Sequence, residues 1–106
     1  MTRLPCPYLK GEVELTDERE RDIRDRHPDL LPEWRYQMAL TLADPDAVRR
    51  SSRMANARIF SRWFDKMKGG RHAVVIVVSE VTGRHWVITA YQARRLAEGA
   101  IEWKRS

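Results

Sequence analysis

The most constraining feature of this sequence is the run HAVVIVVS at residues 72–79, which is almost wholly apolar and rich in β-branched side chains. Residues 68–70 (KGG) precede it and residues 81–83 (VTG) follow it, and both triplets are typical of turns. Because neither face of the run carries a regular series of polar residues, it predicts a central strand covered on both faces.

Further strands are predicted around this run from period-2 patterns. RIFSRWFD at 58–65 and HWVITAY at 85–91 flank it in the sequence, and the turns between them favour an antiparallel meander. Shorter candidates are AVRRSS at 47–52, AIEWK at 100–104 and an edge strand, GEVEL, at 11–15. In HWVITAY, alternation assigns Trp86, Ile88 and Ala90 to the packed side and places Thr89 and Tyr91 together on the opposite face.

Two helices are predicted before the meander. TDERERDIRDRH at 16–27 has acidic residues in its first turn and a pattern resembling a capping box, and it stops before Pro28. Its i, i+4 spacing places His27 on the same stripe as Ile23. PEWRYQMALTLAD at 32–44 has a broad apolar face and is predicted to be the main core helix.

The length of 106 residues suits a single domain. We therefore expect an α+β domain, with two N-terminal helices packed on one face of a four- to five-stranded antiparallel sheet and residues 1–12 as an N-terminal extension. The chain has no apolar run near the ~20 residues of a membrane span and no secretory signal pattern. Its single cysteine, Cys6, excludes an internal disulfide, and together these features predict a cytoplasmic protein.

Charge is distributed unevenly along the chain. Residues 1–47 hold 7 Lys/Arg and 11 Asp/Glu, a net charge of −4, whereas residues 48–106 hold 13 and 4, a net charge of +9. A strongly basic C-terminal half favours an anionic partner over a merely solvated surface.

The usual catalytic and metal-binding motifs are absent, and few carboxylates lie in the strand region, so any chemistry is predicted to be metal-independent and cofactor-free. The residues that remain are His27, the strand arginines, Thr89 and Tyr91. Histidine can transfer protons near neutral pH, and arginine can bind phosphate bidentately, as metal-free RNA cleavage requires. His27 equally suits a helix C-cap, Thr89 suits any strand, and Trp63 and Trp86 are typical of core side chains.

The segments LTDERERDIRDRHPDL, LADPDAVRRS, RIFSRWF, AVVIVVS and VITAYQARRL resemble, in order and spacing, phage-associated nucleases of the barnase–EndoU–colicin–RelE-like fold. The resemblance covers about residues 13–95. It implies a small, toxin-like ribonuclease of phage or mobile-element origin, with two helices before a four-stranded antiparallel sheet. It also implies His27, Thr89 and Tyr91 as site residues, with Arg62 as the basic residue of the first long strand. Arg53 is the alternative to Arg62, and Lys66, just past that strand, is a further basic residue near the same position.

Our hypothesis is a metal-independent endoribonuclease that leaves a 2′,3′-cyclic phosphate. His27 would act as general acid or base, Arg62 would neutralise the phosphate, and Thr89 and Tyr91 would orient it. Four further basic residues would contact RNA: Arg53, Lys66, Arg94 and Arg95. The expected partners are RNA and an acidic immunity or antitoxin protein. The alternatives are a noncatalytic nucleic-acid-binding module and a protein-interaction domain that docks an acidic partner.

Overall fold

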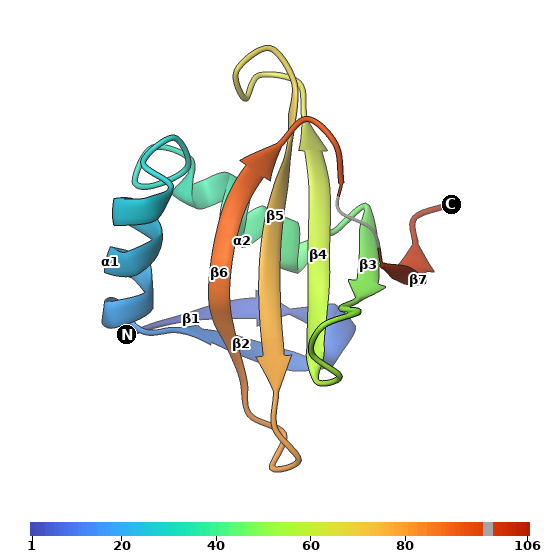
Figure 1. Cartoon of the computed structure of the whole chain (residues 1–106). Helices are drawn as coiled ribbons and strands as arrows, with labels where there is room; N and C mark the ends of the chain where they lie inside the picture. The colour runs from blue at the N-terminus through green and yellow to red at the C-terminus, as the bar shows by residue number, and fades with distance from the viewer. Residues whose placement is uncertain (97–98) are drawn as a thin grey trace.

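The computed structural model describes residues 1–96 and 99–106 (Figure 1). Its α-helices are α1 (Asp17–Arg26) and α2 (Arg35–Ala43), and a short 3-10 helix, η1, spans Pro7–Leu9. The strands are β1 (Thr2–Cys6), β2 (Gly11–Leu15), β3 (Ala47–Arg50), β4 (Ala57–Phe64), β5 (Arg71–Ser79), β6 (His85–Ala93) and β7 (Ala100–Lys104). Among the described residues, neither α-helix has the length and apolar character of a membrane-spanning segment.

The sheet differs from the predicted one. It has seven strands in the order β1-β2-β6-β5-β4-β3-β7, and it is mixed, because β2 pairs parallel to β6. The expectation of a four- to five-stranded antiparallel sheet is therefore wrong. Only one residue pair, Glu14 with Trp86, joins β2 to β6. At this narrow junction the β1–β2 hairpin diverges from β6 and crosses behind β4 and β5 (Figure 1).

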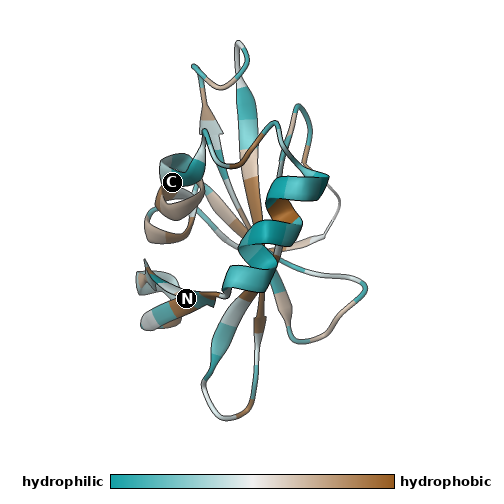
Figure 2. Ribbon diagram, turned by 90° about the vertical axis from the view of Figure 1, so that its left-hand side faces the viewer, coloured by the Kyte–Doolittle hydropathy of each residue, from teal (hydrophilic) through white to brown (hydrophobic). Residues whose placement is uncertain are grey.

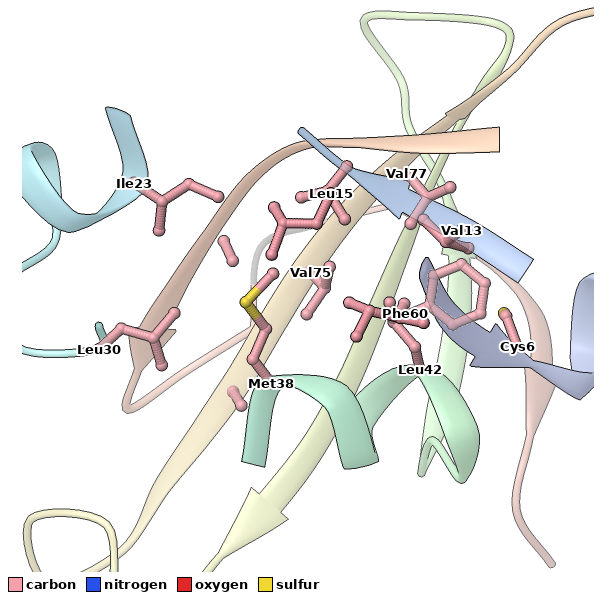
Figure 3. Packing of buried hydrophobic residues seen from close by; sticks show 14 of the residues in the cluster. Cys6, Val13, Leu15, Ile23, Leu30, Met38, Leu42, Phe60, Val75 and Val77 are labelled. Atoms are coloured by element: carbon pink, nitrogen blue, oxygen red, sulfur yellow. The ribbon is translucent and has the colours of Figure 1, made fainter. Parts of the chain in front are cut away.

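The main core lies between the strands β4–β6, the helix α2 and the β1–β2 hairpin. Met38 and Leu42 of α2 point toward Phe60 and Val75 of the sheet, and all four side chains are at most 1% exposed (Figure 3). The hairpin contributes Cys6, which is fully buried. Residues 1–12 are thus part of the sheet and of the core, and not an extension. Sequence periodicity could not show this, because β1 is interrupted by proline and pairs only locally.

The helix α1 is hydrophilic around almost its whole surface (Figure 2) and buries only Ile23. The hydroxyl of Thr16 accepts a hydrogen bond from the backbone N–H of Arg19 and caps its N-terminus. Two side chains tie this part of the chain to β6: Arg19 donates to the carbonyl of Ile88, and Gln92 donates to the carbonyl of Asp29. The helix itself thus docks beside β6 through one buried apolar side chain, Ile23, and the hydrogen bond from Arg19, while Gln92 anchors the turn that follows it.

A β-bulge changes which side chains of β6 face the core. Val77 pairs with Val87 and Ile76 pairs with Thr89, so Ile88 is the extra residue. Val87 and Ala90 consequently both join the core cluster, whereas Trp86 does not. The predicted packed set of Trp86, Ile88 and Ala90 is wrong for Trp86 and Ile88, neither of which belongs to the core cluster, because strict alternation does not survive an inserted residue.

Candidate active site on the open face of the sheet

We call the side of β3–β6 that faces away from α2 the open face; it faces the viewer in Figure 1. Strand pairing and the membership of the main core identify the side chains on this face. Those with polar or aromatic groups are Arg49, Ser61, Trp63, His72, Trp86, Thr89 and Tyr91. In the described ranges no helix covers this face.

His27 lies next to Tyr91. Their ring centroids are 5.9 Å apart, with the ring planes inclined at 39°. The backbone of His27 is fixed on both sides: its N–H donates to the carbonyl of Ile23, and its own carbonyl accepts from Leu30 and Leu31. As the C-cap of α1, His27 therefore ends the helix and is held at the edge of β6 beside the open face.

Thr89 and Tyr91 lie two residues apart on the same face of β6, beyond the bulge. Their partners on β5 are Ile76 and Val74 respectively. Both side chains are partly buried. The expectation that these two hydroxyls share a face is confirmed, although the side chains that accompany them differ from those predicted.

His72 on β5 is a neighbour that the sequence did not single out. It precedes Val74, the partner of Tyr91, by two residues, which makes His72 and Tyr91 a diagonal pair about 7–8 Å apart at the backbone. Burial lowers the pKa of His72 below its usual 6.5; Asp46 opposes this shift and Arg49 adds to it. The imidazole is therefore neutral at neutral pH and can accept a proton.

Arg49 supplies a cation on the open face. Its guanidinium lies 3.5 Å from the hydroxyl of Ser61, which is only 1% exposed. Val74 separates Ser61 from Tyr91 in the register of β4, β5 and β6. With strands about 4.8 Å apart, the backbones of Ser61 and Tyr91 lie about 10 Å apart across Val74.

The structure does not bring Arg62 to this face. Arg62 pairs with Ala73 on the core side of the sheet, and its guanidinium binds the carboxylate of Asp44 at 2.7 Å and stacks over Phe64. Arg53 is also distant, in the turn between β3 and β4 at the opposite end of the strands from Tyr91. Neither residue can serve as the phosphate-binding group beside Tyr91 in this arrangement.

Lys66, Arg94 and Arg95 lie at the end of the sheet nearer to Tyr91. Lys66 follows β4, and the two arginines follow β6, where Ala93 pairs with His72. All three side chains are exposed. This position is compatible with the predicted role of the three residues, which is to bind RNA without taking part in catalysis. That role stays a prediction.

No family model, curated protein or solved structure matches this chain. Within residues 1–96 and 99–106, no three His, Cys, Asp or Glu side chains are grouped so that they could hold a metal ion. Any functional assignment therefore depends on the site itself.

The open face, together with His27 at its edge, combines two imidazoles, three hydroxyl-bearing side chains (Ser61, Thr89 and Tyr91) and a guanidinium. Histidine transfers protons, hydroxyls donate hydrogen bonds to phosphate oxygens, and a guanidinium neutralises their charge. His72 was missed, and Arg49 was not singled out among the strand arginines, because their relation to Tyr91 depends on strand register. The only sequence signal for His72 was its period-2 spacing from Val74 and Ile76.

Proposed function

We propose that this protein is a metal-independent endoribonuclease that cleaves RNA by attack of the 2′-hydroxyl, leaving a 2′,3′-cyclic phosphate. The observation that carries the proposal is the position of His27 beside Tyr91, with His72 diagonal to Tyr91 on the adjacent strand. Two imidazoles that flank a hydroxyl-bearing surface can divide the two proton transfers of this reaction between them. A relation to the phage-associated nucleases, and action on cytoplasmic RNA, belong to the same proposal.

His72 is the general base in this scheme, because its lowered pKa keeps it unprotonated at neutral pH. It removes the proton of the 2′-hydroxyl, whose oxygen attacks the adjacent phosphorus. His27, as the general acid, gives a proton to the departing 5′-oxygen. Arg49 neutralises the phosphate, and Thr89 and Tyr91 donate hydrogen bonds to its oxygens as charge develops.

The test is cleavage of a single-stranded RNA in the presence of EDTA, with His27→Gln as the decisive variant. Loss of a positioned acid or base costs about 10²–10⁴-fold in rate, so His27→Gln should cleave at least about a hundredfold more slowly. The control is His85→Gln. His85 lies at the other end of β6, where its ring is hydrogen-bonded to the hydroxyl of Ser79. Its replacement should leave the cleavage rate within about twofold of the wild-type rate.

The products distinguish this reaction from others. A 2′,3′-cyclic phosphate and no cleavage of DNA of the same sequence are expected, because DNA lacks the attacking hydroxyl. A folded wild-type protein that leaves RNA intact, or a His27→Gln variant that cleaves at the wild-type rate, would overturn the proposal. Salt-sensitive RNA binding without cleavage would instead indicate the noncatalytic module.

A further inference from the structure

Trp63 is an exposed aromatic side chain beside the proposed site. It lies at the end of β4 on the open face, directly opposite His72, and 42% of its surface is exposed. The sequence favoured a core position for this tryptophan, and the structure shows a surface one. A large exposed apolar ring next to a candidate site calls for an explanation beyond packing.

The indole of Trp63 is fixed from several sides. Its Nε1–H donates to the carboxylate of Asp65 at 2.6 Å, and its backbone N–H donates to the carboxylate of Asp46 at 2.7 Å. The His72 ring meets it edge-on, with centroids 4.9 Å apart. The backbone of Gly70 approaches so closely that a Cβ there would lie 2.6 Å from the indole Cζ2. A ring held in this way loses little conformational freedom when it stacks on a ligand.

Positive charge gathers at the same end of the sheet. Five basic residues flank the ends of β4, β5 and β6 there: Lys66, Lys68, Arg71, Arg94 and Arg95. In the ranges that the structure describes, none of the five forms an ion pair with a carboxylate. A fixed aromatic ring amid these cations suits a single-stranded nucleic acid, whose bases stack while its phosphates bind the cations.

We infer that Trp63 is a stacking platform for an unpaired nucleobase of single-stranded RNA. Trp63 lies two strands across and one two-residue step along from Tyr91, a backbone distance of about 12 Å from standard strand spacings. The stacked base therefore belongs to a nucleotide near the phosphate held at Tyr91, and not to the reacting one. This inference rests on the proposed function for its substrate class, but it concerns affinity and not cleavage.

The test measures binding to two fluorescent oligonucleotides that cannot be cleaved. One is a 2′-O-methyl RNA, which lacks the attacking hydroxyl, and the other has the same length and phosphates but abasic 2′-O-methyl sugars. Wild type should bind the first at least about tenfold more tightly, the usual contribution of one stacked base. Trp63→Ala should lose that preference while it keeps its affinity for the abasic strand. Trp63→Phe should retain part of the preference.

Trp103→Ala is the matched control. Trp103 is similarly exposed, at 38%, but packs near Tyr8 on the other face, and its removal should leave the preference unchanged. Equal base preference in wild type and Trp63→Ala would overturn the inference, and so would a wild type with no base preference. Because neither oligonucleotide can react, the result is independent of whether the protein cleaves RNA.

Discussion

Replacement of Gly70 with alanine tests whether the indole of Trp63 is held by its surroundings. Gly70 has φ +115°, a conformation that L side chains rarely adopt, and the new Cβ would lie 2.6 Å from the indole. The backbone strain costs about 1–3 kcal/mol. Displacement of the ring from Asp65 and His72 adds about 1 kcal/mol, the order of one hydrogen bond or aromatic contact. The free energy of unfolding should fall by about 2–4 kcal/mol.

Gly69→Ala is the control for backbone strain alone. Gly69 also has positive φ, +75°, but a Cβ there meets nothing within 4 Å. Its cost should be about 1–2 kcal/mol, and urea unfolding should therefore give a higher midpoint for Gly69→Ala than for Gly70→Ala.

A double-mutant cycle isolates the contact itself. In a Trp63→Ala background the Cβ at position 70 has no ring to displace, so Gly70→Ala should cost about 1 kcal/mol less than in the wild type. A coupling energy of zero between Gly70→Ala and Trp63→Ala would refute the argument that Trp63 is fixed by this close approach.

Three further outcomes are expected. Because burial lowers the pKa of His72, the unfolded state takes up a proton at a higher pH than the folded state does. The free energy of unfolding should therefore be at its full value above about pH 6.5 and fall as the pH drops below it. His72→Asn should reduce that fall, as measured by urea unfolding at several pH values. The Asp44 carboxylate binds Arg62 and Arg105, and Arg105 directly follows β7. Asp44→Asn should therefore speed amide hydrogen exchange in β7 while exchange in β5 is unchanged. Equal protection of the β7 amides in the wild type and the variant would contradict this. Val87→Thr should lower the free energy of unfolding by about 1–3 kcal/mol, because Val87 is fully buried, whereas Thr at an exposed valine such as Val81 should change it by less than about 0.5 kcal/mol.

The sequence predicted the individual elements well where local signals are strong. The acidic first turn and Pro28 bound α1 correctly to within a residue, and the apolar run at 72–79 is the centre of β5. The second helix begins at Arg35 and not at Pro32, because residues 30–34 form turns before it. These features depend on neighbours within one or two turns of chain, so periodicity and capping chemistry reveal them.

The candidate site was only partly predictable for the same reason. His27, Thr89 and Tyr91 come from short motifs, and the structure places them close together. The predicted cation, Arg62, faces the core side, and Arg49 and His72 occupy the open face in its place. The register between strands decides which face of the sheet each arginine occupies. A shift of one residue moves the side chain to the opposite face.

Local sequence patterns were enough to predict the ends of α1, the central strand β5 and the shared face of Thr89 and Tyr91 on β6. Tertiary structure alone decided the rest: the bulge at Ile88 that buries Val87, the fold-back of the β1–β2 hairpin over the core, and the exposure of Trp63. Each of these depends on contacts between segments far apart in the chain. Such contacts depend on the apolar surface that the whole domain buries, and no single stretch of the sequence reveals it.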